Sequence, residues 1–196
     1  PSEQTPLSLA RLVALLNDVL PEGVLNLVNG RGPVTGAALV ANPDVDLISF
    51  TGGTETGRAI MSAAGQHLVP TTMELGGKSA NIIFASADIE RALDGALQGI
   101  FSNNGQQCLA GSRILVERSM FDEFTARFAE RAKRIKVGDP LDDATEVGPL
   151  ASAPHMNRVL SFANMAREDG GSVLTGGTRR DDLGGGYFIE PTAVLA

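Results

Sequence analysis

Residues 45–64 read VDLISFTGGTETGRAIMSAA, a short apolar run that is followed by two glycines and a longer mixed stretch. The run Val45–Phe50 predicts a buried strand, Thr51–Gly53 a tight turn and Thr54–Ala64 a helix. Outward from this unit, strands and helices are predicted in alternation along the chain. Such alternation favours an α/β fold with largely parallel sheets.

The flanking elements are predicted from apolar runs, capping residues and Gly or Pro breaks. The expected helices cover 5–20, 33–41, 88–103, 119–136 and 152–168, with Thr5, Asp88, Ser119 and Ser152 at their N-termini. The expected strands cover 24–28, 68–74, 80–84, 112–117, 173–174 and 187–195. A polar, Gly-rich loop is expected over 176–186.

The composition is that of a globular protein: 196 residues, 43% hydrophobic and 20% charged, with a net charge of −7. The acidic balance argues against binding to nucleic acid or to an anionic membrane, because no phosphate-neutralising surface is available. No apolar run approaches the roughly 18 residues of a membrane span, and no secretory pattern opens the chain. A single cysteine, Cys108, excludes an intramolecular disulfide and fits a reducing, cytoplasmic location. No ligand-like spacing predicts a metal site.

Glycines stand at two junctions where a strand is followed by a helix, Gly30–Pro33 and Gly52–Thr54. Unpaired N–H groups and the positive dipole end at a helix N-terminus stabilise a phosphate, and glycine allows its close approach. The spacing Gly30-x-Gly32-x-x-x-Gly36 is not that of a GxGxxG fingerprint. The two junctions are therefore open to two interpretations: ordinary tight turns, or parts of a nucleotide site.

Two further residues are candidates for chemistry. Cys108 lies in a loop of small and neutral residues between a predicted helix and a predicted strand, where reactive groups are common; a buried structural thiol is the alternative. Glu74 ends an apolar strand before two glycines. A desolvated carboxyl there has a raised pKa and suits a general base, whereas the alternative is a solvated Glu or one paired with Lys78. Periodicity alone does not bring Cys108 and Glu74 together.

Three motifs in this order and spacing resemble the aldehyde dehydrogenase superfamily: FTGGTETGR at 50–58, MELGGKSA at 73–80 and FSNNGQQCLAGS at 101–112. Softer matches at 138–140, 147–149 and 188–192 extend the likeness over essentially the whole chain. The resemblance implies part of a Rossmann-type, parallel-sheet cofactor domain over 1–76, followed by part of an α/β catalytic domain over 77–196. Because members of the superfamily are longer, we expect this chain to be a piece of a larger protein. Its sheets then end in open edges, and the helix over 119–136 lacks part of its packing surface.

The resemblance also assigns roles by position. Cys108 matches the nucleophile and Glu74 the general base. The implied cofactor-binding positions are Glu3 at the adenosine ribose, Gly32, Gly52 and Gly53 at the turns around adenosine and pyrophosphate, and Leu75 at the nicotinamide. The implied cofactor is NAD, with NADP as the alternative. The implied partners are a small-molecule aldehyde and further copies of the complete protein, as a homodimer or homotetramer. The likeness to hydroxymuconic semialdehyde dehydrogenases implies a semialdehyde.

The implied reaction begins with addition of the Cys108 thiolate to an aldehyde and ends with hydrolysis of a thioester. The Cys108 N–H supplies one oxyanion donor, and the superfamily's second donor, an Asn, is expected upstream of these residues. Two alternatives stay open. The chain as it stands acts only as a nucleotide-binding or assembly fragment, or Cys108 serves a cysteine hydrolase with His155 as base.

Overall fold

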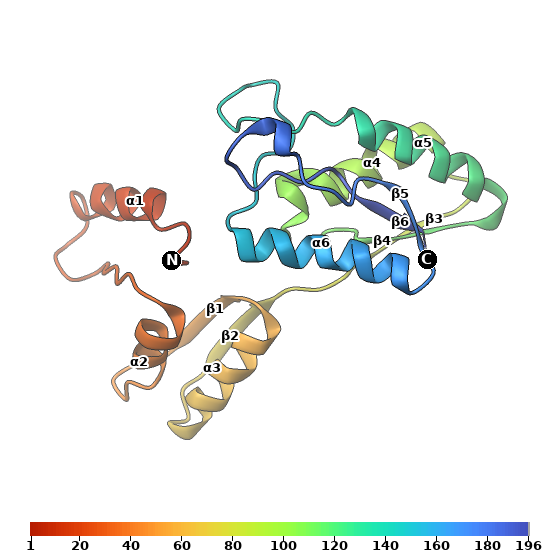
Figure 1. Cartoon of the computed structure of the whole chain (residues 1–196). Coiled ribbons are helices and arrows are strands. Elements are labelled where there is room, and N and C mark those ends of the chain that lie inside the picture. The colour runs from red at the N-terminus through yellow and green to blue at the C-terminus, as the bar shows by residue number, and fades with distance from the viewer. Residues whose placement is uncertain (196) are drawn as a thin grey trace. The chain divides into compact units, whose positions relative to one another are not determined.

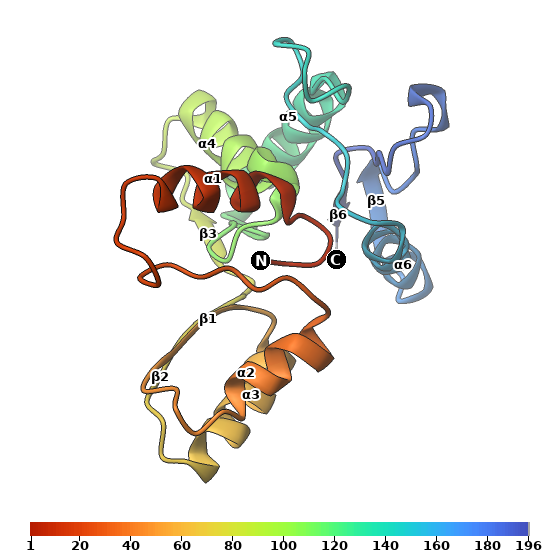
Figure 2. The same ribbon diagram turned by 90° about the vertical axis from the view of Figure 1, so that its left-hand side faces the viewer.

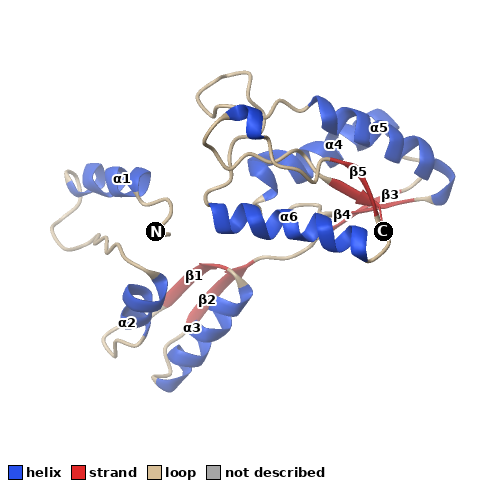
Figure 3. Ribbon diagram, viewed as in Figure 1, coloured by secondary structure: helices blue, strands red, loops and turns tan. Residues whose placement is uncertain are grey.

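The computed structural model describes residues 1–195, and the chain divides into two compact units, Pro1–Gly76 and Gly77–Ala196. Both units combine helices with two-stranded sheets (Figures 1 and 3). Two of the sheets are parallel and the third is antiparallel. The expected α/β class with largely parallel sheets is confirmed.

The first unit contains one complete strand–helix–strand crossover. Its elements are α1 (Leu7–Asn17), a π-helical turn (Gly32–Gly36), α2 (Ala37–Val40), β1 (Ile48–Gly52), α3 (Thr54–Gln66) and β2 (Thr71–Leu75). Strands β1 and β2 pair in parallel, with Gly52 opposite Leu75, and α3 connects them. Helix α3 packs closely on the sheet at Gly57, where an added Cβ would lie 2.8 Å from the Leu75 side chain.

The second unit begins with another parallel crossover. Its elements are β3 (Ala80–Ile83), α4 (Ile89–Phe101), β4 (Arg113–Val116), α5 (Phe121–Arg134), α6 (Ala153–Glu168), β5 (Ser172–Thr175) and β6 (Ala193–Leu195), with short 3₁₀ turns at Ser102–Gly105, Arg118–Met120 and Asp181–Leu183. Strands β3 and β4 are parallel, whereas β5 and β6 are antiparallel with one irregularity. Helices α4 and α5 lie side by side (Figure 2).

The core of the second unit forms where α4 and α5 meet β3. Its buried members are Ile83, Leu93, Ala96, Phe124, Phe128 and Ala132. The α5 members follow a spacing of four residues, which places them on one helix face. The rings of Phe124 and Phe128 lie 6.0 Å apart, and Phe128 also stacks on Phe101 at 6.1 Å. Each such buried aromatic or leucine contributes roughly 1.5–3 kcal/mol through its removal from water.

Two of the predicted helix caps are confirmed and two are wrong. Asp88 Oδ1 accepts hydrogen bonds from the N–H groups of Glu90 and Arg91 at 2.9 and 3.2 Å. Ser152 Oγ likewise accepts from His155 N–H. Ser119 instead lies within a 3₁₀ turn and donates to Glu117, so α5 begins only at Phe121. Thr5 closes a turn with Ser2, and Pro6 holds the N-cap position of α1.

Two predicted strands also differ from the structure. Residues 24–28 form no strand, because strand pairing in the first unit is confined to β1 and β2 within the described residues 1–195. The terminal strand spans only Ala193–Leu195 rather than 187–195. Pro191, which has no N–H to donate, lies between β6 and an isolated bridge that joins Ile189 to Arg179.

Residues 1–195 contain neither a membrane-spanning helix nor a metal-binding cluster of side chains. No helix there is long and apolar enough to cross a membrane. No cluster of three or more His, Cys, Asp or Glu side chains there is arranged to hold a metal ion.

Candidate functional site

Cys108 lies in the loop that leads from the end of α4 to the start of β4. Its thiol is free and exposed, so the interpretation of a buried structural cysteine is wrong. The loop runs beside the segment that enters β3: an added Cβ on Gly77 would lie 3.7 Å from the Cys108 carbonyl oxygen. Arg113, at the start of β4, bonds the same segment through its N–H to Ser79 O at 3.2 Å and through Nε to Lys78 O at 2.9 Å.

The cysteine loop begins with a sharp backbone reversal. Asn103, Asn104 and Gly105 have φ values of 50°, 58° and 70°, all in the left-handed region. Asparagine enters this region more readily than other side chains, and glycine enters it freely. At Gly105 an added Cβ would also lie 3.0 Å from the Ile100 carbonyl oxygen. The sequence Asn-Asn-Gly therefore matches the local backbone that ends α4 and redirects the chain.

The far end of the loop is anchored as firmly as its beginning. The N–H of Gly111 donates to the carbonyl of Gly99 in α4 at 3.1 Å. Ala110 is buried and donates to Gln107 O at 3.2 Å. Cys108 thus stands exposed on a short loop whose two ends are both fixed to the core of the second unit. This arrangement exposes the thiol while the backbone on both sides of it stays ordered.

Glu74 lies near the end of β2, opposite Thr51 of β1. Its neighbours Met73 and Leu75 are half-buried, whereas Glu74 itself is exposed. The expectation of a desolvated carboxyl is therefore wrong for the described chain, because the alternation of the strand turns this side chain outward. Glu74 belongs to the first unit and Cys108 to the second. Their pairing stays a prediction.

A cavity of about 460 Å³ brings Glu3 and Gly32 together in the first unit. Its other lining residues are Pro1, Val28, Gly30, Thr35, Gly36, Ala38, Leu39 and Asn42. The cavity combines apolar walls with the Glu3 carboxylate, a hydrogen-bond acceptor. Gly30 is needed there, because any side chain at that position would collide with Thr35.

Thr35 and Asn42 are polar residues of this cavity that the sequence did not single out. The Gly30-x-Gly32-x-x-x-Gly36 spacing did indicate this place in the chain, since all three glycines line the cavity.

The other two predicted glycines occupy a different position. Gly52 ends β1, and Gly53 precedes α3 with extended backbone angles, so that its carbonyl accepts the first helical bond from Gly57. In the described part of the chain, residues 1–195, no side chain caps the first turn of α3. Its N–H groups are therefore free of side-chain partners, as a phosphate site at a helix N-terminus requires. Leu75, the last predicted position, packs its side chain on Gly57.

His155 lies in the first turn of α6, half-buried, with its backbone N–H on Ser152. Within residues 1–195 no hydrogen bond joins its imidazole to Cys108. The structure therefore adds no observation in favour of a Cys–His pair.

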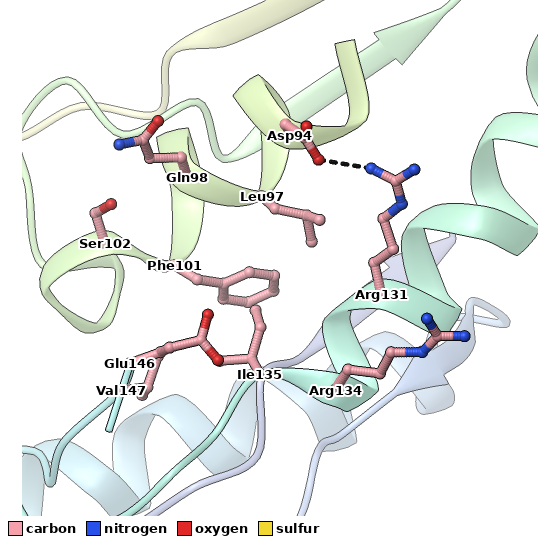
Figure 4. A pocket seen from close by; sticks show the side chains of 10 residues that line it. All are labelled: Asp94, Leu97, Gln98, Phe101, Ser102, Arg131, Arg134, Ile135, Glu146 and Val147. Carbon is pink, nitrogen blue, oxygen red and sulfur yellow. Dashed lines mark hydrogen bonds and ion pairs between the residues drawn. The ribbon is translucent and has the colours of Figure 1, made fainter. Parts of the chain in front are cut away.

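A second cavity, of about 430 Å³, lies between α4 and α5 (Figure 4). Its charged side chains are Asp94, Arg131, Arg134 and Glu146, around Leu97 and Phe101. Arg131 bonds Asp94 at 2.6 Å and also bonds Glu90, so its charge is already neutralised. Hydrogen bonds from Arg127, and then from Arg131, lower the pKa of Glu90. We interpret the charged side chains that line this cavity as part of an ion-pair network that joins the two helices.

Comparison with known proteins gives a match over the full chain. The family model described as "Aldehyde dehydrogenase family" matches residues 1–196. Betaine aldehyde dehydrogenase of Bacillus subtilis (strain 168) is 48% identical over 195 residues, which are 98% of this chain and 40% of the relative. The 5-carboxymethyl-2-hydroxymuconate semialdehyde dehydrogenase of Escherichia coli is 49% identical over 199 residues, which are 98% of this chain and 42% of that relative.

Solved structures agree with these sequence matches. A betaine aldehyde dehydrogenase from Staphylococcus aureus, in complex with NAD⁺, superposes with a TM-score of 0.95 at 44% identity, over 99% of this chain and 39% of that one. PnpE from Pseudomonas sp. WBC-3 superposes with a TM-score of 0.96 at 49% identity, over 99% of this chain and 40% of that one. The chain thus spans about two fifths of the length of the relatives that it matches.

Proposed function

The chain belongs to the aldehyde dehydrogenase family, and from that premise we propose that it supplies the thiol centre and part of the cofactor domain of an NAD-dependent enzyme that oxidises an aldehyde to a carboxylic acid. The observation that carries the proposal is the free, exposed Cys108 on a loop anchored at both ends. Residues 1–76 form part of the cofactor domain, and residues 77–196 form part of the catalytic domain.

In the proposed reaction the Cys108 thiolate adds to the aldehyde carbonyl carbon and forms a thiohemiacetal. Cysteine suits this step because its thiolate is accessible near neutral pH and is intrinsically nucleophilic. The backbone N–H of Cys108 donates to the oxyanion that develops beside it. NAD⁺, when bound, supplies the acceptor for the hydride that leaves the former aldehyde carbon. The enzyme is left with an acyl group on the Cys108 sulfur.

Glu74 is the proposed base for the second half of the reaction. Its carboxylate takes a proton from water, the resulting hydroxide attacks the thioester, and the Cys108 thiolate leaves as the carboxylic acid forms. The pairing rests on the places of Glu74 in the motif MELGGKSA and of Cys108 in the motif FSNNGQQCLAGS.

The cavity of the first unit fits the adenosine part of NAD. Its apolar walls suit a purine, and the Glu3 carboxylate can accept hydrogen bonds from both ribose hydroxyls. Gly30 and Gly32 keep side chains out of the turn that the ligand would approach. Gly52, Gly53 and the N-terminus of α3 are the proposed neighbours of the pyrophosphate, and the backbone of Leu75 is the proposed neighbour of the nicotinamide.

The proposed substrate is a small-molecule aldehyde, with semialdehydes as the first class to screen. The name of the Escherichia coli relative supports that class, and the names of the two betaine aldehyde dehydrogenases extend the screen to cationic aldehydes. We propose that the complete protein works in the cytoplasm as a homodimer or homotetramer.

The decisive test is Cys108→Ser in the complete protein, with NADH formation followed by absorbance during an aldehyde screen. The proposal predicts aldehyde-dependent NADH formation in the wild type and its loss by at least about a thousandfold in the variant. A variant that keeps a substantial share of the activity would contradict the mechanism. A wild-type complete protein that binds NAD⁺ but oxidises no aldehyde would favour the nucleotide-binding alternative.

A further inference from the structure

One side chain joins the cysteine loop to a distant part of the second unit. The Asn104 amide, through Nδ2, donates to the carbonyl oxygens of both Gly148 and Pro149, at 3.1 and 3.0 Å. These acceptors lie 44 and 45 residues further along the chain. Asn104 is half-buried, so both bonds are partly shielded from water.

The segment that receives these bonds is itself fixed on both sides. Val147 is buried, bonds Lys136 O through its N–H at 3.1 Å, and accepts from Gly138 N–H at 3.1 Å. Leu150 is buried as well, and its N–H bonds Tyr187 O at 3.0 Å. The carbonyls of residues 148 and 149 therefore have a defined position, and a group that binds both of them is held in place.

The preceding residue provides an internal contrast. Asn103 has nearly the same φ as Asn104, but its side chain is exposed. Among the described residues 1–195, its amide donates only to Gln106 O, at 3.2 Å, inside its own turn. The two asparagines thus share a backbone conformation and differ in what their amides bind. Within the described residues 1–195, only the Asn104 amide joins the cysteine loop to residues 146–150 by a side-chain hydrogen bond.

We propose that Asn104 is a positioning residue for Cys108, an inference that rests on the proposed function. The loop is fixed by Asn104 on one side of the thiol and by the Gly111–Gly99 hydrogen bond on the other. Together these contacts set the direction of the Cys108 N–H and of its thiol. We call the two Asn104 hydrogen bonds the clamp. A misplacement of about 1 Å at a reacting centre can cost about a hundredfold in rate. Loss of the clamp should therefore slow thiolate addition and leave cofactor binding unchanged.

The test compares Asn104→Asp with Asn103→Asp in the complete protein. Aspartate keeps the size of asparagine and tolerates the left-handed region, but its carboxylate has no donor for the two carbonyls. We expect Asn104→Asp to lower kcat about tenfold to a hundredfold, with the KM for NAD⁺ within about threefold of wild type. Asn103→Asp should stay within about twofold in both quantities. Equal kcat values for the two variants would overturn the proposal.

Hydrogen exchange of the amides over 105–110 gives a readout that does not depend on dehydrogenase activity. We expect Asn104→Asp to speed this exchange about tenfold, and Asn103→Asp to leave it close to wild type. Unchanged exchange in the Asn104 variant would overturn the clamp even if kcat fell. If the wild type is active but Asn104→Asp changes neither kcat nor exchange, the clamp is wrong and the proposed function stands. A wild type without dehydrogenase activity contradicts the proposed function alone.

A second pair, Asn104→Gly and Asn103→Gly, guards against a variant that fails to fold. Glycine keeps the positive φ and removes the amide without adding charge. We expect Asn104→Gly to lower kcat and to speed exchange over 105–110, and Asn103→Gly to leave both close to wild type. A fall in kcat that follows the melting temperature equally in both glycine variants would overturn the proposal in favour of a general effect on stability.

Discussion

The two units differ in how much of their apolar surface they bury. In the second unit α4 and α5 enclose Leu93 and Phe124, which are 0% and 1% exposed. In the first unit α1 buries Val13, but Leu12 and Leu15 on the same helix are 50% and 48% exposed. The proposed thiol centre therefore lies on a unit with a packed core of its own, whereas the proposed cofactor-binding residues lie on a unit with little buried apolar surface.

The largest expected effect is on stability, in the 196-residue chain. Phe124→Ala should lower the free energy of unfolding by about 3–5 kcal/mol, because it leaves a cavity among α4, α5 and β3. Leu12→Ala, the matched truncation on α1, should change it by less than about 0.5 kcal/mol, since half of that side chain is already exposed. Urea titration followed by circular dichroism measures both values. Equal losses would remove the contrast between the units.

A smaller effect is expected on cofactor choice, in the complete protein. A carboxylate at Glu3 accepts bonds from two ribose hydroxyls but repels a 2′-phosphate. We expect kcat/KM to favour NAD⁺ over NADP⁺ by one to two decades, or ~1.4–2.8 kcal/mol. Glu3→Gln should reduce that ratio, whereas Glu22→Gln, on an exposed turn of the same unit, should leave it unchanged. If Glu3→Gln left the ratio of the two kcat/KM values unchanged, Glu3 would not determine cofactor choice.

The smallest effect concerns acid stability of the second unit. Hydrogen bonds from Arg127 and Arg131 lower the pKa of Glu90 in the folded state. A lowered folded pKa adds stability above the ordinary carboxyl pKa, and this stability disappears as pH falls through the folded value. Glu90→Gln should therefore weaken the acid dependence of the urea midpoint in the range below the ordinary carboxyl pKa. Glu168→Gln, at the exposed end of α6, should preserve it. An identical acid dependence in both variants would show that the network is too solvated to matter.

Local signals predicted most of the elements. Asp88 and Ser152 cap their helices as expected, and the Gly52–Gly53 turn joins β1 to α3. These features depend on neighbours within a few residues, which the sequence displays directly. Ser119 is an exception, because this capping residue type lies in a 3₁₀ turn just ahead of the helix.

Features that depend on distant partners could not be predicted. The apolar run at 24–28 has strand-like composition, but a strand exists only where another strand pairs with it. The pattern of the helix over 119–136 indicates an apolar face, but it does not show that α4 and β3 cover Phe124 and Ala132. The sequence indicates only that Asn104 lies in a loop, because its two acceptors lie 44 and 45 residues away along the chain. Glu74 was placed correctly near a strand end, but its exposure depends on what surrounds β2.

In the proposed reaction Cys108 carries the acyl group and Glu74 releases it. The most direct measurement is mass spectrometry of the Glu74→Gln variant of the complete protein, quenched after reaction with an aldehyde substrate and NAD⁺. We expect an NADH burst together with an acyl adduct on the peptide that contains Cys108, formed only when NAD⁺ is present. A burst without this adduct, or an adduct on any other residue, would contradict it.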